Sequence, residues 1–350
     1  MTPSKSRAFI FLLLLFTLLS FFSSLFNFSL LNQKLYLQKW HPNLSQRNIS
    51  ILLWHWPFGH SYSLDGDKCL QMYNISHCLL SDNTTAFSSA DVVVFHHWEL
   101  GNGLSTLPLH LARPRPQHWV WMSMEPPVNN ANLAKLNGLF NWTMSYRHDA
   151  DISIPYGQTV VGSDQSDFQP PANRCLASWV VSRYEPHEVR FKVYQSLKKY
   201  IPIEVYGRWK NKSLSARKLL PTIAKCLFYL SFENSKAKDY ISEKLWRNAF
   251  QAGVIPVVLG PSRSTYEAVA PPDSFIHVDD FRSTAHLAAY LKHVARDRQT
   301  YENATVCVCL LGLLLPLPPV VGVNLSVWSA GLVPSLRVLR EKGGLGRTLW

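Results

Sequence analysis

The segment YLSFENSKAKDYISEKLWRNAF, residues 229–250, places six polar side chains between two apolar segments: Glu233, Asn234, Asp239, Tyr240, Glu243 and Lys244. A lysine ammonium neutralises phosphate as a point charge. A carboxylate accepts hydrogen bonds from ribose hydroxyls, and an asparagine amide both donates and accepts them. The combination indicates a site for a phosphorylated ligand that is rich in hydroxyl groups. The same residues would also suit a surface helix capped by Asp239, with Glu243 and Lys244 in solvent.

Several motifs that would define another ligand are absent from the chain. It contains neither G-x-G-x-x-G nor G-x-x-x-x-G-K-[ST], which argues against a dinucleotide oxidoreductase and a P-loop ATPase. No set of cysteines and histidines has the spacing of zinc ligands, and His96 and His97 form a bare pair. We therefore expect no metal site.

Apolar runs without strict alternation predict buried parallel strands before and after the polar segment. We expect these strands at 49–56, 90–98, 118–125, 176–182, 201–207, 227–232 and 254–259. Apolar residues at helical spacing predict helices at 185–200 and 240–251. Residues 227–259 then form a βαβ unit with parallel strands and a right-handed connection. This arrangement places the polar segment at the carboxyl ends of strands, where open α/β sheets bind their ligands.

The length of 350 residues favours two domains of ordinary size. The proline-containing, polar stretch 157–171 is the expected linker. We expect one domain at 51–165 and a Rossmann-like domain at 166–303.

The N-terminal region has the features of a membrane anchor. Residues 8–31 carry no charge, are long enough to span a bilayer as a helix, and follow Lys5 and Arg7. Positive charge before the span predicts a cytosolic tail at 1–7, an anchor at 8–31, a stem at 32–50 and a luminal or extracellular remainder. A cleaved signal peptide is the alternative, but the run exceeds a usual h-region and lacks an A-x-A-like cleavage site.

Glycosylation sequons and cysteines agree with the lumen of the secretory pathway. Sequons begin at Asn43, Asn48, Asn74, Asn83, Asn141, Asn211, Asn303 and Asn324. Cys69 and Cys78 are close enough in sequence to form a disulfide in an oxidising lumen. Cys226 lies inside an apolar strand and is expected to be a buried free thiol.

The net charge of +12 suggests anionic partners. Lysine and arginine are spread thinly, however, with no dense cluster and no nucleic-acid motif. We expect no nucleic-acid partner.

The polar segment closely resembles the donor-site motif of the α-(1,3)-fucosyltransferases, glycosyltransferase family 10. Further motifs follow the order of that family: ILLWHWPFG at 51–59, FHHW at 95–98, WVWMSMEPP at 119–127, SYRHDADISIPYG at 145–157, VYGRW at 205–209 and PPDSFIHVDDF at 271–281. The resemblance covers roughly residues 50–303. It implies a GT-B architecture, with two Rossmann-like domains facing across a cleft, in a single-pass type II protein of the Golgi membrane.

The resemblance also implies the reaction. Members of the family transfer L-fucose from GDP-β-L-fucose to the 3-hydroxyl of N-acetylglucosamine in N-acetyllactosamine glycans of glycoproteins or glycolipids, with inversion, and they need no obligatory cofactor. The HWPF sequence and the spacing of Cys69 and Cys78 are most similar to the subtype that prefers sialylated acceptors and makes sialyl Lewis x.

Each functional residue of the family can be placed by its motif in this chain. Glu125 in WVWMSMEPP is the implied base, although a glutamate at a strand end is otherwise most often structural or solvated. Arg208 and Lys244 are the implied cations that balance the departing GDP. The implied donor-binding residues are Tyr156, Ser182, Arg190, Arg208, Asn234, Tyr240, Glu243 and Lys244. Without the motifs, Arg208 would be a surface salt bridge and Tyr156 a packed aromatic.

The chain departs from the family pattern at four places. Pro126, directly after Glu125, stands where the family usually has serine. Trp98 and Arg183 stand where the family usually has arginine and asparagine, on the acceptor and donor sides respectively. Residues 304–350 replace the family's terminal segment with an apolar sequence that is expected to be non-homologous; a second membrane span at 306–323 is the alternative. Loss of the usual end could leave an inactive or merely glycan-binding luminal isoform.

Overall fold

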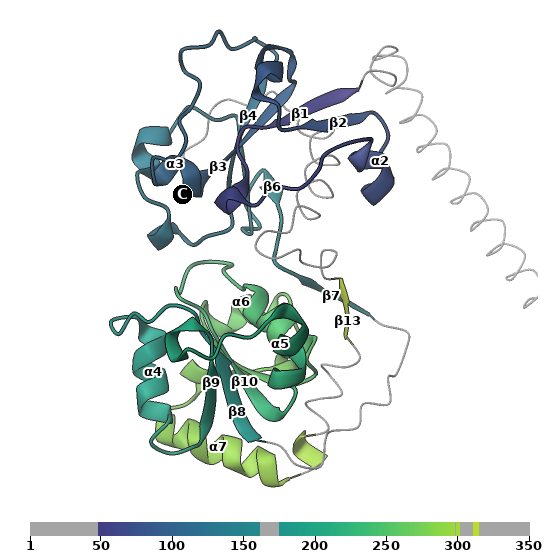
Figure 1. Ribbon diagram of the computed structural model, residues 1–350. Helices are drawn as coiled ribbons and strands as arrows, with labels where there is room; N and C mark the ends of the chain where they lie inside the picture. Colours follow the sequence, from purple (N-terminus) through teal and green to yellow (C-terminus); the bar gives the residue numbers. More distant parts are fainter. Residues whose placement is uncertain (1–47, 162–174, 298, 302–310, 315–350) are drawn as a thin grey trace, which may run out of the picture. The chain divides into compact units, whose positions relative to one another are not determined.

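A computed structural model describes residues 48–161, 175–297, 299–301 and 311–314 (Figure 1). The chain divides into two compact units, residues 1–49 and 50–350, and almost all described residues belong to the second. The predicted anchor at 8–31, the sequons at Asn43, Asn303 and Asn324, and most of the apolar tail lie outside the described residues. Within the described ranges, no helix is long and apolar enough to cross a bilayer.

The first sheet has six strands in the order β2-β1-β3-β4-β5-β6. Their bounds are β1 (Ile49–Leu53), β2 (Cys78–Ser81), β3 (Val92–His96), β4 (His118–Ser123), β5 (Trp142–Ser145) and β6 (Ile152–Ser153). Strands β1, β3, β4, β5 and β6 pair in parallel. The apolar runs of β1, β3 and β4 predict this pairing, whereas the short strands β5 and β6 were not predicted. The predicted strand at 90–98 is too long at its end, because His97 begins the short helix α3 (His97–Gly101).

The second sheet has five parallel strands in the order β12-β11-β10-β8-β9. These are β8 (Cys175–Val180), β9 (Ile203–Tyr206), β10 (Cys226–Phe232), β11 (Ile255–Leu259) and β12 (Ile276–His277). The parallel pairing of β10 with β11 confirms the predicted βαβ unit.

Helices cover both faces of the second sheet. Phe228 and Leu230 of β10 pack in one core cluster with α4 (Val189–Leu197) and α7 (Thr284–Arg296), which lie side by side in Figure 1. Tyr229, between them in sequence, points to the opposite face and packs with Ile223 of α5 (Ala216–Ile223). The π-helix η6 (Lys244–Phe250) and α6 (Arg263–Glu267) also pack on that second face.

The helix predicted at 240–251 is shorter than expected. Its regular part begins at Lys244 and has π geometry, whereas Tyr240–Ser242 are not helical. The cause is the backbone N–H of Ser242, which donates to Oε1 of Glu233 at 2.8 Å instead of to a preceding carbonyl. Asp239 has a φ of 60° and does not cap the helix, and five of the seven helical residues are buried. The alternative of a capped surface helix is therefore wrong.

Two disulfides are present among the described residues. Cys69 of α2 (Lys68–Tyr73) bonds Cys78 at the start of β2, which confirms the predicted pair. Cys175 bonds Cys226, so the prediction of a free thiol at Cys226 is wrong. The two residues occupy opposite register positions on adjacent parallel strands, a relationship that sequence spacing alone does not reveal.

A small third sheet joins two distant segments. Strand β7 (Gln158–Val161) pairs antiparallel with β13 (Leu311–Leu314). The predicted linker thus begins with a strand, and four residues of the predicted second membrane span form a strand.

Candidate active site

The second sheet has a topological switch point at its carboxyl edge. Read from β9, the strands follow the order 2-1-3-4-5, which reverses between β8 and β10. Ligands of doubly wound sheets bind in the crevice at this position. Ser182 follows β8 and Asn234 follows β10, so two of the predicted donor-binding residues flank the switch point.

A glycine brings a third predicted residue to the same edge. Gly207 follows β9 with a φ of 107°, and a Cβ placed on it would overlap the backbone carbonyl of Val181. This close approach places Arg208 beside the loop that begins at Ser182. Arg208 is exposed and has no ion-pair partner among the described residues, so the alternative of a surface salt bridge is not observed.

Asn234 has an unsatisfied buried acceptor. Its Oδ1 is buried and has no hydrogen-bond partner within the described part of the chain. Buried polar atoms are nearly always bonded in native proteins, so an exception calls for an explanation. Its place directly after β10, at the switch point, makes a ligand donor a natural partner.

Lys244 is held by carboxylates. Its Nζ lies 2.9 Å from Oε2 of Glu233 and 3.4 Å from Oε1 of Glu243, and it donates to Oγ of Ser242 at 2.7 Å. Burial alone would lower the pKa of Lys244, but the two carboxylates raise it above its usual value. Burial likewise would raise the pKa of Glu243, but Lys244 and then Arg247 lower it below its usual value. Lys244 is therefore a cation whose charge is largely balanced, and its ion pair with Glu233 is buried; the alternative that Lys244 is fully solvated is wrong.

Tyr156 and Tyr240 contact each other edge to face, with ring centroids 6.2 Å apart. The Tyr156 hydroxyl donates to the backbone carbonyl of Met124 at 2.6 Å. Burial, followed by the nearby carboxylates of Glu125 and Glu243, raises the pKa of Tyr156 well above its usual value. The structure thus brings Tyr156, Tyr240 and the implied base Glu125 together, and both tyrosines remain neutral donors at any physiological pH.

Glu125 follows β4 and is partly exposed. Its Oε2 accepts from Nδ2 of Asn129 at 2.7 Å. Its backbone is fixed on both sides, because Ser123 Oγ accepts from its N–H and Asn130 Nδ2 donates to its carbonyl. The base position is therefore a fixed turn after a strand, and Oε1 of Glu125 has no hydrogen-bond partner among the described residues.

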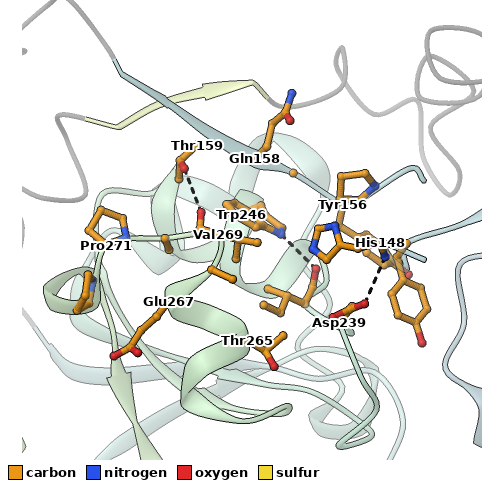
Figure 2. A pocket seen from close by; sticks show the side chains of 17 residues that line it. His148, Tyr156, Gln158, Thr159, Asp239, Trp246, Thr265, Glu267, Val269 and Pro271 are labelled. Carbon is orange, nitrogen blue, oxygen red and sulfur yellow. Dashed lines mark hydrogen bonds between the residues drawn. The ribbon is translucent and has the colours of Figure 1, made fainter. Parts of the chain in front are cut away.

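A cavity of about 560 Å³ is lined by Tyr156 but by neither Glu125 nor the other predicted donor-binding residues. Figure 2 shows that Tyr156, His148 and Asp239 lie on one side of it and Thr265 and Glu267 on another. The backbone N–H of His148 donates to Oδ2 of Asp239, and this bond joins two segments that are 91 residues apart. Gly157 lines the cavity against Trp246, where any side chain would overlap the indole.

Two predicted donor-side residues are placed less directly. Arg190 lies in the first turn of α4, is buried, and is paired with Glu188. Arg183, the departure from the family pattern, points into solvent with a side chain 75% exposed and pairs with Glu185. The guanidinium group of Arg183 is therefore directed towards Glu185.

Sequence reasoning missed an aromatic stack at the same edge. The rings of Tyr184 and Trp209 lie parallel at 4.8 Å, and Lys210 covers the indole at 4.2 Å. Tyr184 is 41% exposed. Tyr184 directly follows Arg183, and Trp209 directly follows Arg208. Their positions just after two predicted strands could have indicated that both rings lie at this edge of the sheet.

The carboxyl edge of the first sheet holds a buried polar cluster. His96 Nδ1 lies 2.6 Å from Oε2 of Glu99, and His55 Nε2 lies 3.6 Å from the same oxygen. Trp98, the other departure from the pattern, packs against Phe58 with ring centroids 5.2 Å apart. No group of three or more histidine, cysteine, aspartate or glutamate residues is placed to hold a metal in the described ranges.

Two family models match the chain. "Fucosyltransferase, N-terminal" matches residues 46–157, and "Glycosyltransferase family 10 (fucosyltransferase) C-term" matches residues 170–304. Human α-(1,3)-fucosyltransferase 7 is 48% identical over 254 residues, which cover 72% of this chain and 73% of that protein. The chain belongs to glycosyltransferase family 10.

Other relatives set the limits of that assignment. The mouse α-(1,3)-fucosyltransferase 7 is 47% identical over 72% of this chain, but the match spans only 64% of the mouse protein. Mouse 4-galactosyl-N-acetylglucosaminide 3-α-L-fucosyltransferase 9 is 44% identical over 72% of this chain and 69% of its own length. The resemblance to the family and to its subtype 7 is therefore confirmed.

Solved structures of an α1,3-fucosyltransferase share the fold. The complex with GDP-fucose matches with a TM-score of 0.54 at 17% identity, over 87% of this chain and 94% of that one. The complex with GDP matches with a TM-score of 0.53 at 16% identity, over 88% and 94%. The predicted α/β fold with parallel sheets is confirmed, while the facing of two domains across a cleft and the domain bounds stay predictions.

Proposed function

We propose that the chain transfers L-fucose from GDP-β-L-fucose to the 3-hydroxyl of N-acetylglucosamine in N-acetyllactosamine glycans, with inversion and without an obligatory metal or other cofactor. The observation that carries the proposal is the buried Oδ1 of Asn234, which has no hydrogen-bond partner among the described residues and lies at the switch point. Arg208, which has no ion-pair partner in the same ranges, follows β9 at the same edge of the sheet. A hydroxyl-rich anionic ligand suits an acceptor and a cation at the same edge of a sheet.

In this proposal Glu125 is the general base. Its Oε1 takes the proton of the attacking hydroxyl while Asn129 donates a hydrogen bond to Oε2. The fucosyl carbon develops oxocarbenium character as its bond to the diphosphate oxygen breaks, so the base must lie on the face opposite the leaving group. The hydroxyls of Tyr156 and Tyr240 are neutral, so they do not compete with the Glu125 carboxylate for the proton of the attacking hydroxyl.

The leaving GDP carries the charge that needs stabilisation. Arg208 supplies a cation that has no ion-pair partner in the described part of the chain, and Lys244 supplies one that Glu233 already holds in place. Arginine binds phosphate oxygens through two parallel N–H groups, so Arg208 is the main diphosphate ligand in this proposal. Asn234 and Glu243 accept from sugar hydroxyls, while Ser182 and Arg190 contribute from β8 and α4.

The acceptor preference is proposed from the relatives. The chain is 48% identical to the human α-(1,3)-fucosyltransferase 7 over the matched residues. It also contains the HWPF sequence and the Cys69–Cys78 disulfide, the two features by which it resembles that subtype. We accordingly propose sialylated N-acetyllactosamine as the acceptor and a sialyl Lewis x structure as the product; neutral acceptors and Lewis x are the second candidate. The proposed location is the Golgi membrane, with a single anchor at 8–31 and the catalytic region in the lumen.

The test is transfer of labelled fucose by the full chain in membranes of a host without such activity. Parent, Glu125→Gln and the control Glu204→Gln, an exposed carboxylate on β9, are incubated with GDP-fucose and sialylated or neutral N-acetyllactosamine. We expect the parent and the control to be active and Glu125→Gln to lose 10²–10⁴-fold in kcat, roughly the contribution of a general base. GDP affinity should stay within threefold.

Two results would contradict the proposal. A parent that binds GDP without transferring fucose would favour the inactive or glycan-binding alternative, whereas incorporation of a different sugar would indicate another transferase. Full activity of Glu125→Gln would remove Glu125 from the mechanism while leaving the reaction in place.

A further inference from the structure

We infer that Glu233 is a positioning residue of the donor site, which fixes Lys244 and the non-helical turn before it in the arrangement used for transfer. The inference rests on the proposed function and adds to it a residue that contacts neither the fucose nor the acceptor. The Glu233 carboxylate accepts four hydrogen bonds within the described part of the chain.

Both oxygens of Glu233 are occupied by a single short segment. Oε1 accepts from the backbone N–H of Ser242 at 2.8 Å and from its Oγ at 2.9 Å. Oε2 accepts from the same hydroxyl at 2.8 Å and from Nζ of Lys244 at 2.9 Å. One buried side chain therefore sets the backbone at Ser242 and the side chain at Lys244 together.

The end of β10 carries a second, uncharged anchor for the same segment. Ser231 Oγ donates to the backbone carbonyl of Lys244 at 2.8 Å. The Glu233 backbone N–H is itself fixed, since it donates to the carbonyl of Leu259 on the neighbouring strand at 2.7 Å. Glu233 thus transmits the rigidity of two central strands to the start of η6.

The energetics favour a role beyond packing. Burial raises the pKa of Glu233, and the attraction of Lys244 opposes that rise. A buried ion pair gains little stability over apolar side chains of similar volume, because desolvation offsets the Coulomb attraction. The π geometry of η6 is also a rare form that occurs frequently at functional sites.

The position of the pair links it to the donor. Glu233 is the first residue after β10 and lies at the switch point. It directly precedes Asn234, whose Oδ1 is buried and unsatisfied in the described ranges. Tyr240 and Glu243, two further donor-site residues, stand on either side of Ser242 in the segment that Glu233 holds. Loss of the carboxylate would release Lys244 and displace this whole turn.

The test compares Glu233→Gln with the matched control Ser231→Ala in the full chain. Glutamine keeps the shape and can still accept from Ser242, but its amide cannot balance the Lys244 ammonium. Ser231→Ala removes the uncharged anchor of the same turn. Each variant is assayed for kcat, for KM of GDP-fucose, for KM of the acceptor and for thermal midpoint.

We expect Glu233→Gln to lower kcat by 10- to 100-fold with an acceptor KM within twofold of the parent. Glu233→Asp, which keeps the charge on a shorter side chain, should recover part of that loss. Ser231→Ala should lower the thermal midpoint as much as Glu233→Gln or more, yet keep kcat within threefold. A purely structural role would instead make kcat follow the thermal midpoint in all three variants, and that result would overturn the inference.

A double variant keeps the test decisive if Glu233→Gln does not fold. Glu233→Gln combined with Lys244→Met leaves no uncompensated cation, and its kcat should equal that of Lys244→Met alone, because Glu233 acts through Lys244. A further loss of more than tenfold in the double variant would overturn the inference. A parent without fucose transfer would overturn the proposed function, whereas an active parent with an equally active Glu233→Gln would overturn only the role of Glu233.

Discussion

Asn129 donates a hydrogen bond from Nδ2 to Oε2 of Glu125 at 2.7 Å, although Asn129 itself is exposed. The bond fixes Oε2 of the proposed base, whereas Oε1 has no hydrogen-bond partner within the described ranges. Asn129 ends the short 3₁₀ turn Pro127–Asn129, and its N-cap Pro126 together with Pro127 fixes the backbone directly after Glu125. The sequence EPPVN therefore builds a rigid support for one carboxylate.

Replacement of Asn129 by alanine should lower kcat by about threefold to tenfold, since a misplaced base loses part of its contribution. The KM of GDP-fucose should not change, because Asn129 has no contact with the donor-side residues of the second sheet. Steady-state kinetics of Asn129→Ala beside Lys135→Ala, an exposed residue of the next turn, measures this effect. Equal kcat in the two variants would show that Glu125 needs no such support.

Gly207 should tolerate no side chain. A Cβ would overlap the Val181 carbonyl, and the φ of 107° is strained for any other residue. We expect Gly207→Ala to lower the free energy of unfolding by about 2–4 kcal/mol and to weaken donor binding through displacement of Arg208. Gly103→Ala is the matched control, because Gly103 also has a positive φ of 70° but nothing within 4 Å of the added carbon. Urea denaturation gives the free energy of unfolding of both variants. The loss in Gly103→Ala measures backbone strain alone, and the additional loss in Gly207→Ala measures the steric overlap with Val181. Equal losses in the two variants would contradict the close approach of Gly207 to Val181.

The two disulfides should differ in their contribution to stability. Cys175 and Cys226 close a loop with a sequence separation of 51, and Cys69 and Cys78 one with a separation of 9. Loop entropy then predicts losses of about 4 and about 3 kcal/mol when each pair is replaced by serine. Peptide mapping without reductant checks the pairing, and urea denaturation checks the order. A larger loss for the Cys69–Cys78 pair would argue against the entropic account.

Four of the five strands of the second sheet were predicted from their sequence, the exception being β12, and the site at its edge was predicted only in part. Runs such as LFYLSF and IPVVL are apolar on both faces, which indicates buried parallel strands whatever the ligand. The partners of Lys244 could not be read in this way, because Glu233 lies eleven residues earlier and reaches it only through the turn at Ser242. The bond between Cys175 and Cys226 likewise depends on strand register, and local pattern carries no information on register between distant strands. Residue motifs thus predicted which side chains belong to the site, whereas the ion-pair partners of those side chains depend on tertiary contacts.

His97 should make the stability of the protein depend on pH. It lies at the start of α3, is buried, and accepts from Trp121 Nε1 at its Nδ1. Burial, followed by repulsion from His96, lowers its pKa from 6.5 to about 4. Between these two values the unfolded chain binds a proton that the folded chain does not, so stability is complete above pH 6.5 and falls as the pH falls towards 4.

The expected loss at pH 5 is about 2 kcal/mol relative to pH 7.5, because the unfolded imidazole is then almost fully protonated and the folded one is not. Asparagine keeps an acceptor near the position of Nδ1 and does not titrate, so His97→Asn should remove most of this loss. His293→Asn, an exposed residue of α7, should leave the loss unchanged. Free energies of unfolding from urea titrations at the two pH values provide the measurement. An unaltered pH dependence in His97→Asn would transfer the effect to the neighbouring His55, whose pKa burial also lowers.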